Sequence, residues 1–227
     1  MQIRAIIPAR IGSKGIPEKN LAVVGGLSLV ERAILTAKQS SSFSEIIVSS
    51  DSDEILDKVL TLGATPHRRP DEFSQDTSKA NDVVTDVLDS LGAEVFDDDV
   101  FFYIQPTSPF TQVFTLQDIL RKILEGSGPV FSARKSDPAE KLLKLDNSMI
   151  ARSLLNEGKP TENRQSFVST YIATGGCYAF TVEHFKRWKD IPVLGAMAHL
   201  VRWPEDFDID NQEDLLTAQM IVDLGGI

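Results

Sequence analysis

The chain carries, near its amino terminus, the stretch Ile3-Arg-Ala-Ile-Ile-Pro-Ala-Arg-Ile-Gly-Ser-Lys-Gly15. It is a short apolar run that ends in a polar loop, which is typical of a strand buried inside a parallel sheet. Helix spacing follows from Leu29 to Ala37, with Ser28 as the expected N-cap and Glu31 completing a capping box. The stretch therefore predicts a buried strand, a loop and a helix, which together begin a parallel βαβ unit.

The alternation of strand and helix continues along most of the chain. Apolar runs predict further strands at 45–51, around 65, at 100–104, at 130–133, at 176–180 and near 200–203. Helix spacing predicts helices at 53–62, 81–91, 116–124, 182–188 and 212–224. This order predicts an α/β fold with a mostly parallel central sheet flanked by helices.

One segment departs from this rhythm. The stretch 134–174 is polar and irregular, with its apolar residues gathered at Leu142, Leu143 and Leu145. We expect an excursion of hairpin and loop there, and a single domain over 1–227, since a chain of 227 residues is short for two large domains.

Charge and cysteine content exclude several classes of function. Acidic residues outnumber basic ones by 33 to 23, and a net charge of −10 disfavours nucleic acid and anionic membranes as partners. A small anionic ligand remains possible where cations cluster locally. Cys177 stands alone, which excludes an internal disulfide, and no apolar run of ~18 residues predicts a membrane span. We expect a soluble cytoplasmic protein.

Polar side chains gather where the predicted strands end. In open parallel sheets ligands bind beyond the carboxyl ends of the strands, so these loops are expected to meet at one rim. They carry Arg10, Ser13, Lys14, Lys19, Asn20, Ser49, Ser50, Asp51, Arg68, Arg69, Gln105, Thr107, Ser108, Asp208 and Asp210.

The first loop has the composition of a phosphate site. Gly12 and Gly15 would let backbone N–H groups approach an anion, while Arg10, Lys14 and Lys19 supply positive charge. The loop matches neither the Walker pattern nor G-x-G-x-x-G, so a P-loop NTPase or dinucleotide oxidoreductase is disfavoured. By itself the loop is equally compatible with an exposed basic turn.

The last two of these loop residues, Asp208 and Asp210, are carboxylates. In the extended run Asp208-Ile209-Asp210 they would project to one side about 7 Å apart, a spacing that suits Mg²⁺ shared with substrate phosphates. The alternative is that Asp210 caps the final helix. For the run Asp97-Asp98-Asp99, a solvated turn is favoured over a metal cluster.

The run from Pro8 to Asn20 resembles the amino-terminal signature of the CMP-acylneuraminate cytidylyltransferases, enzymes that activate sialic-acid-type sugars. The chain lacks the Arg-Leu-Pro-Gly-Lys-Pro sequence usual in the related enzymes for deoxy-octulosonate. Further segments agree in order along the chain: Ile47-Val-Ser-Ser-Asp51, Arg68-Arg69, Asp76-Thr-Ser78, Gln105-Pro-Thr-Ser-Pro109, Arg164-Gln165 and Asp208-Ile-Asp210.

The resemblance implies a Rossmann-like nucleotide-diphospho-sugar transferase fold and a specific reaction. The anomeric hydroxyl of a 2-keto-3-deoxy sugar acid attacks the α-phosphorus of CTP, and pyrophosphate leaves with the help of Mg²⁺. By motif position, the resemblance implies nucleotide contacts from Arg10, Ser13, Lys14, Gly15, Lys19, Asn20, Arg69 and Ser78, sugar contacts from Gln105, Arg164 and Gln165, and metal ligation by Asp208 and Asp210. Arg10, Lys19 and Asp210 would be catalytic, with either Asp210 or the metal aiding deprotonation.

Departures from the family pattern concern the sugar. Thr174-Gly175 stands where Asn-Gly is common, and Ala80 stands where a second serine is frequent. The acceptor is therefore expected among sialic, legionaminic and pseudaminic acids without a choice between them. Alternatives are a nucleotidyltransferase for deoxy-octulosonate or an aldose 1-phosphate, or a non-catalytic nucleotide-binding subunit. Family members exchange a segment across a dimer where 134–174 lies, which implies a homodimer.

Overall fold

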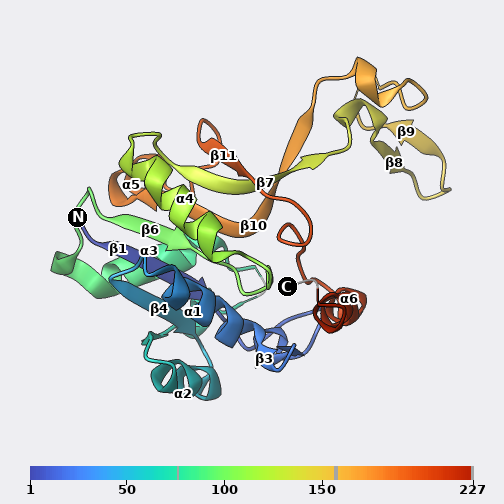
Figure 1. The fold of residues 1–227 in the computed structure, drawn as a ribbon. Helices are drawn as coiled ribbons and strands as arrows, with labels where there is room; N and C mark the ends of the chain where they lie inside the picture. Colours follow the sequence, from blue (N-terminus) through green and yellow to red (C-terminus); the bar gives the residue numbers. More distant parts are fainter. Residues whose placement is uncertain (76, 156–157, 226–227) are drawn as a thin grey trace.

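The computed structural model describes residues 1–75, 77–155 and 158–225, and its centre is a seven-stranded sheet with helices on both faces (Figure 1). Its order is β11-β7-β10-β6-β1-β4-β5. The strands are β1 (Ile3–Pro8), β4 (Glu45–Ser50), β5 (Thr65–Arg68), β6 (Val100–Tyr103), β7 (Val130–Ser136), β10 (Thr170–Thr181) and β11 (Met197–Leu200). Only β10 runs antiparallel to its neighbours, so the predicted α/β fold with a mostly parallel sheet is confirmed.

Six α-helices belong to the described residues. They are α1 (Leu29–Ser40), α2 (Asp53–Thr61), α3 (Ala80–Leu91), α4 (Val113–Leu124), α5 (Val182–Trp188) and α6 (Gln212–Asp223). The predicted capping box of α1 is confirmed, since the Ser28 side chain accepts from the backbone N–H of Glu31 and the Glu31 carboxylate accepts from the backbone N–H of Ser28. Two short strands, β2 (Val23–Val24) and β3 (Leu27–Ser28), pair just before it.

Side chains that alternate along β1 build two cores, one on each face of the sheet. Ala5 and Ile7 pack with apolar residues of α1, α2 and α4, whereas Ile6 packs with those of α3 and α5. All three side chains are fully buried, as expected for a strand in the middle of a sheet that is covered on both faces.

A third apolar cluster lies beyond the sheet and fixes α6. Ile16 of the first loop, Phe110 and Ile209 pack against Ala218 and Ile221 of α6. Ile209 is fully buried there. Burial of this apolar surface ties the last helix to the loop that follows the first strand, two segments almost two hundred residues apart in the chain.

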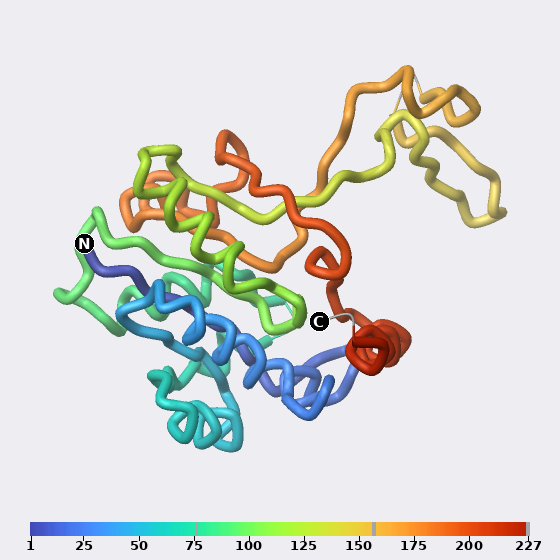
Figure 2. Tube along the Cα trace, viewed as in Figure 1, coloured from blue at the N-terminus to red at the C-terminus, as the bar shows by residue number. Residues whose placement is uncertain are grey.

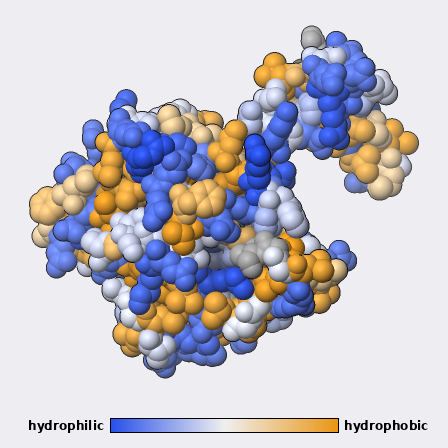
Figure 3. Space-filling view, viewed as in Figure 1, coloured by the Kyte–Doolittle hydropathy of each residue, from blue (hydrophilic) through white to orange (hydrophobic). Residues whose placement is uncertain are grey.

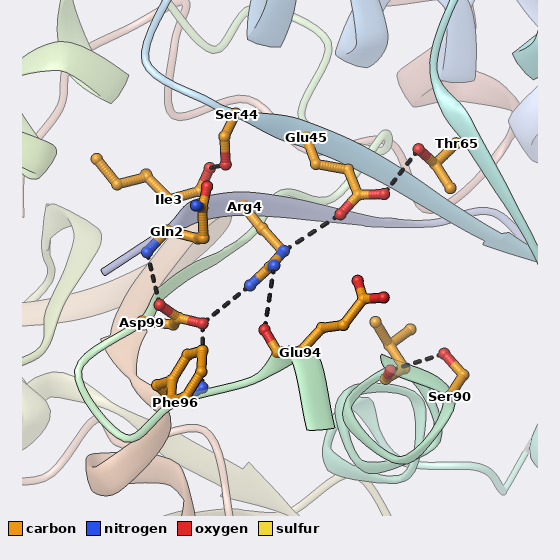
Figure 4. A network of polar contacts seen from close by, with 11 residues as sticks. Gln2, Ile3, Arg4, Ser44, Glu45, Thr65, Ser90, Glu94, Phe96 and Asp99 are labelled. Carbon is orange, nitrogen blue, oxygen red and sulfur yellow. Dashed lines mark hydrogen bonds and ion pairs between the residues drawn. The ribbon is translucent and has the colours of Figure 1, made fainter. Parts of the chain in front are cut away.

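The amino-terminal ends of the strands are held by a buried ion-pair network (Figure 4). Arg4 Nη1 lies 3.0 Å from Asp99 Oδ2, and Arg4 Nε lies 3.2 Å from Glu45 Oε2. The Asp99 carboxylate also accepts from the backbone N–H groups of Gln2 and Phe96. The expected solvated turn at 97–99 is therefore wrong for Asp99, because the arginine and the two amides satisfy its charge away from water.

Several predicted boundaries differ from those observed. The helix expected at 116–124 begins three residues earlier, at Val113, and the strand expected near 200–203 is Met197–Leu200. Pairing with β7 decides the second case: Leu200 lies opposite Ala133, and the chain then turns away. Likewise β7 and β10 extend into the stretch expected to be irregular, since their polar ends pair with each other.

The described residues of the segment 137–169, which we call the arm, leave the sheet between β7 and β10 and project from the body of the molecule (Figures 2 and 3). The arm contains a hairpin of β8 (Leu143–Leu145) and β9 (Ala151–Ser153). It exposes large apolar side chains, among them Leu143, Leu145 and Val168. None of the described helices combines the length and apolar character that a membrane crossing requires.

Candidate functional site

The loop after β1 is held in shape by side chains from two neighbouring segments. Asp51, at the end of β4, accepts a hydrogen bond of 2.8 Å from the backbone N–H of Ile11. Asn20 is buried and donates through Nδ2 to the carbonyl of Arg10, also at 2.8 Å. Both bonds anchor the backbone around Arg10, so its side chain leaves the loop from a fixed point at the carboxyl end of the sheet.

The acid pair lies against this loop. Lys19 Nζ donates to the carbonyl of Ile209 at 2.8 Å and lies 3.5 Å from the Asp210 carboxylate. Burial of Ile209 in the third core turns the flanking carboxylates the other way, and both line one hollow with Arg134 and Trp203. The cationic loop and the two acids are thus joined directly, although the run 208–210 is an extended loop rather than a strand.

The two carboxylates differ in their surroundings. Burial raises the pKa of Asp208, and the nearby Asp210 charge adds to the rise, while hydrogen bonds from Thr107 and Ser108 and the charge of Lys19 oppose it. Ser108 Oγ donates to Asp208 Oδ1 at 3.2 Å. Asp210 is exposed. The site therefore holds one sheltered and one solvated carboxylate.

Gly15 makes the close approach of the two segments possible. A Cβ at this position would overlap the carbonyl oxygen of Asp210, which belongs to the backbone and cannot swing aside. Glycine is thus required here by contact with the acid pair rather than by a left-handed backbone conformation.

The alternative role of Asp210 as a helix cap is wrong. Asn211 is the N-cap of α6: its side chain accepts from the backbone N–H of Asp214, and the Asp214 carboxylate accepts in return from Asn211. The Asp214 carboxylate also accepts from the backbone N–H of Asp210. The carboxylate of Asp210 is therefore not the group that caps the helix.

A cleft opens beside the first loop, across the ends of β1, β5 and β6. Arg69 lies in its wall and is almost fully buried, while the adjacent Arg68 points outward and pairs with Asp53. The two arginines occupy opposite sides of the chain, as neighbours on an extended segment do. The cleft is lined by Pro8, Arg10, Gly12, Ser13, Lys19, Asn20, Arg69, Gln75, Ser78, Lys79, Ala80, Val83, Tyr103, Gln105, Pro106 and Thr107.

Six predicted site residues do not line this cleft. Asp208 and Asp210 line the hollow with Arg134 and Trp203, and Gly15 lies against the Asp210 backbone. Lys14 is exposed on the first loop and does not line the cleft either. Arg164 and Gln165 belong to the arm, where Arg164 lies 3.0 Å from Asp137 in an exposed ion pair. The expected sugar group of Gln105, Arg164 and Gln165 is therefore not assembled within one chain, because the ribbon of β7 and β10 carries the arm outward (Figure 1).

Both positions that depart from the family pattern lie at the cleft or beside it. Ala80 lines the cleft. The Thr174 hydroxyl donates to Ser132 Oγ at 2.8 Å inside the protein. Gly175 has a φ of +80°, and a Cβ on it would overlap the Gln105 side chain. Asp76, quoted in the resemblance, lies outside the described residues.

Some cleft residues escaped the sequence analysis. Tyr103 follows Phe101 and Phe102 in an apolar run that is typical of the core; it is buried, which raises its pKa, yet it also lines the cleft. Lys79 adds a cation just after Ser78. Position in the sequence could have indicated Tyr103, because this residue ends its strand two residues before the predicted site residue Gln105.

The acid pair fits a magnesium ion that is shared with a substrate. Among the described residues no group of three or more His, Cys, Asp or Glu side chains could hold a metal. Asp208 and Asp210 offer only oxygen atoms, and Mg²⁺ commonly binds through one or two carboxylates together with substrate phosphates and waters. Two carboxylates beside a cationic loop match that donor set.

Sequence comparison identifies the family. The sequence model of a family described as Cytidylyltransferase matches residues 4–174. The chain belongs to the cytidylyltransferase family. The match covers the first loop, Arg69, Gln105 and the arm, and ends before the acid pair.

Two curated relatives match half of the chain or more. The N-acylneuraminate cytidylyltransferase of Oncorhynchus mykiss is 32% identical over 92% of this chain and 48% of its own length. The CMP-N,N'-diacetyllegionaminic acid synthase of Legionella pneumophila is 42% identical over 52% of this chain and 51% of its own length. The chain spans about half the length of these curated relatives.

Solved structures support the fold. A CMP:2-keto-3-deoxy-manno-octonic acid synthetase complexed with CTP superposes with a TM-score of 0.71 at 15% identity, covering 99% of this chain and 100% of that one. A 4-diphosphocytidyl-2C-methyl-D-erythritol synthase from Anaerococcus prevotii gives a TM-score of 0.62 at 18% identity, covering 98% of each chain. The cytidylyltransferase thus has the nucleotidyltransferase architecture that the sequence predicts.

Proposed function

We propose that this cytidylyltransferase transfers CMP from CTP to the anomeric hydroxyl of a nine-carbon 2-keto-3-deoxy sugar acid and releases pyrophosphate. The observation that carries the proposal is the contact of Lys19 with Ile209 and Asp210, which joins the cationic glycine loop that lines the cleft to the two carboxylates that line the hollow with Arg134 and Trp203. The similar proteins named for acylneuraminate and legionaminic acid favour a nine-carbon acceptor.

In this proposal the first loop holds the triphosphate. Arg10, Ser13 and Lys19 line the cleft. The two cations neutralise charge on CTP and on the departing pyrophosphate, and the Ser13 hydroxyl donates a hydrogen bond to a phosphate oxygen. Asn20, Arg69 and Ser78 contact the nucleoside side, while Gln105 faces the acceptor. Since phosphoryl transfer asks the protein mainly for position and charge, a rigid loop anchored by Asp51 is suited to the task.

Asp208 and Asp210 hold Mg²⁺ in this proposal. When bound, the ion supplies positive charge to the phosphate oxygens. The reaction forms a bond from the anomeric oxygen to the α-phosphorus, breaks the bond between the α-phosphorus and the bridging oxygen, and frees the hydroxyl proton. We propose that Asp210, an exposed carboxylate beside Lys19, aids this deprotonation, with deprotonation aided by the metal as the alternative.

We further propose a homodimer in which the arm of each chain meets the other. The arm exposes apolar side chains that water solvates poorly, and it carries Arg164 and Gln165 away from their own cleft. A partner's arm would supply a guanidinium for the sugar carboxylate. The one thiol, Cys177, is buried and unpaired, which suits the reducing cytoplasm that we propose as its location.

A pyrophosphate-release assay that crosses CTP, UTP and ATP with a panel of keto-deoxy sugar acids tests the function. We expect release with CTP and a nine-carbon acid. The variants Asp208→Asn and Asp210→Asn should lose release while CTP binding persists. Release with deoxy-octulosonate or an aldose 1-phosphate alone would contradict the proposed acceptor, and CTP binding without release on any acceptor would indicate a non-catalytic subunit.

A further inference from the structure

A chain of four polar side chains runs from helix α3 to the cleft. Arg69 Nε donates to Ser49 Oγ at 3.0 Å, and His67 Nδ1 lies 3.2 Å from the same hydroxyl oxygen. On the other side of the imidazole, His67 Nε2 lies 3.5 Å from Asp86 Oδ2. Ser49 and His67 are direct partners in the pairing of β4 with β5, so the two strands set this geometry.

The hydrogen bonds of this series all run in the same order from donor to acceptor. An arginine can only donate, so the Ser49 oxygen accepts from Arg69. The Asp86 carboxylate faces His67 Nε2 as an acceptor, which favours the imidazole proton on Nε2 and leaves Nδ1 to accept from the Ser49 hydroxyl. A neutral imidazole that accepts at Nδ1 carries its proton on Nε2, where it faces Asp86. The order from donor to acceptor is therefore Arg69, Ser49, His67 and Asp86.

Burial supports this protonation state. Ser49 is fully buried, and the side chains of His67 and Asp86 are mostly buried. Burial lowers the pKa of His67, and the Arg69 charge adds to the decrease while Asp86 opposes it. Asp86 Oδ2 has no hydrogen-bond partner among the described residues at full bonding distance, so the imidazole N–H is the polar group that faces it.

The series of hydrogen bonds ends at Arg69, a cleft residue that makes two bonds to Ser49. Besides its bond to the Ser49 hydroxyl, Arg69 donates through Nη2 to the Ser49 carbonyl at 2.6 Å. A guanidinium has five N–H donors, and these two bonds fix its plane while it lines the cleft beside Asn20 and Tyr103.

We propose that Asp86, His67 and Ser49 are positioning residues that orient the Arg69 guanidinium for the nucleotide. The inference rests on the proposed function, since it takes CTP as the ligand of the cleft. Ser49 acts through its hydroxyl, His67 orients that hydroxyl, and Asp86 keeps the imidazole proton on Nε2. None of the three touches the reacting atoms.

The test is calorimetric titration of CTP in the presence of Mg²⁺ and without sugar acid, together with pyrophosphate release. Ser49→Ala and His67→Leu should weaken CTP binding about tenfold, the loss expected for a misdirected hydrogen bond to a charged group. His67→Asn should bind within about twofold of the wild type, since its carbonyl oxygen takes the place of the Nδ1 acceptor. The Michaelis constant for the sugar acid should not change.

A double-mutant cycle separates positioning from simple structural damage. In an Arg69→Met background, Ser49→Ala should weaken CTP binding no further, because its effect passes through Arg69. His199→Leu serves as the matched control: this histidine is also buried beside an aspartate, but it lies in β11 at the far edge of the sheet. Its CTP affinity should equal that of the wild type.

Wild-type affinity in Ser49→Ala and His67→Leu would overturn the inference while leaving the proposed function intact. So would a tenfold loss that persists in full when Ser49→Ala is added to Arg69→Met. A wild-type protein that binds no CTP would remove the proposed function, and this inference with it.

Discussion

Gly15 has no room for a side chain, and its substitution tests the contact between the first loop and the backbone of the acid pair. In Gly15→Ala the new methyl group meets the Asp210 backbone, so the loop must move away and carry Lys19 with it. A displacement near 1 Å in an active site costs about 100-fold in turnover. Steady-state pyrophosphate release measures the effect.

The matched control is Gly12→Ala in the same loop. There a Cβ would meet only Arg10 Nη1 at 4.0 Å, an ordinary contact. We expect it to retain more turnover than Gly15→Ala, since no backbone needs to move and its loss comes only from a methyl group added to the lining of the cleft. Equal turnover in Gly15→Ala and the wild type would show that the close approach has no part in the reaction.

Asp99 makes stability depend on acid pH. Burial raises its pKa, but the backbone N–H groups of Gln2 and Phe96 and the Arg4 guanidinium outweigh that effect, and the net pKa is lowered. A carboxyl with a lowered folded-state pKa contributes stability above its unfolded value of about 3.9, and this contribution is lost as the pH falls through that value to the folded pKa. Thermal unfolding between pH 7 and pH 3 should show the loss.

Asp99→Asn should lower the free energy of unfolding at pH 7 by about 3 kcal/mol, since it leaves Arg4 buried without its main partner. Its stability should also fall less steeply with acid than that of the wild type. Asp98→Asn is the control, because Asp98 is exposed and, among the described residues, its ion pair is with the amino terminus. Parallel pH curves for Asp99→Asn and the wild type would contradict the assignment.

At the scale of single residues, the sequence predicts which side chains take part in a site better than it predicts which way each of them points. Composition does not separate Arg68 from Arg69: the family resemblance selects Arg69, and the register of β5 against β4 turns Arg69 inward and Arg68 toward Asp53. The sequence holds no comparable signal for His67, because its neighbours Ser49 and Asp86 are distant in the chain.

At the scale of elements, the capping of α6 links helix stability to the acid pair. Asn211→Ala removes the side chain that caps the helix, at a cost of about 1 kcal/mol. Because the Asp214 carboxylate also accepts from the backbone N–H of Asp210, loosening of this first turn should lower turnover, by about tenfold. Thermal unfolding and pyrophosphate release measure the two effects.

Thr181→Ala provides the comparison. Thr181 caps α5 in the same way, but it lies opposite Val100, at the amino-terminal end of β6 and away from the cleft. It should cost similar stability and leave turnover unchanged. If both variants lose turnover equally, the effect of Asn211→Ala follows from stability alone.

Elements were predictable where burial alone decides them. Runs such as Ile3–Pro8 and Val100–Tyr103 are buried on both faces and are recognisable from composition. Segments whose structure depends on pairing were not: the polar ends of β7 and β10 are strands only because they pair with each other. For the same reason β11 stops at Leu200, where its pairing with β7 ends.

At the scale of the whole molecule, the arm is separable from the sheet. Ser136 and Thr170 face each other in the β7–β10 pairing, so residues 138–168 can be replaced by a short glycine-serine turn. We expect the shortened protein to keep its fold and its CTP affinity. It should sediment as a single chain, and its Michaelis constant for the sugar acid should rise about tenfold, because Arg164 and Gln165 are gone.

Analytical ultracentrifugation of both forms checks this expectation. A wild-type mass near that of one chain would contradict the proposed homodimer. A shortened protein that still sediments as a dimer would place the interface outside the arm.

The bond between Lys19 and the Ile209 carbonyl spans 190 residues of sequence, and it has a consequence for biosynthesis. The loop that carries Lys19 is synthesised 190 residues before Ile209, so the contact cannot form while the later segment is still untranslated. A chain that stops between the two would hold the cationic loop without its acid pair, and we expect it to release no pyrophosphate.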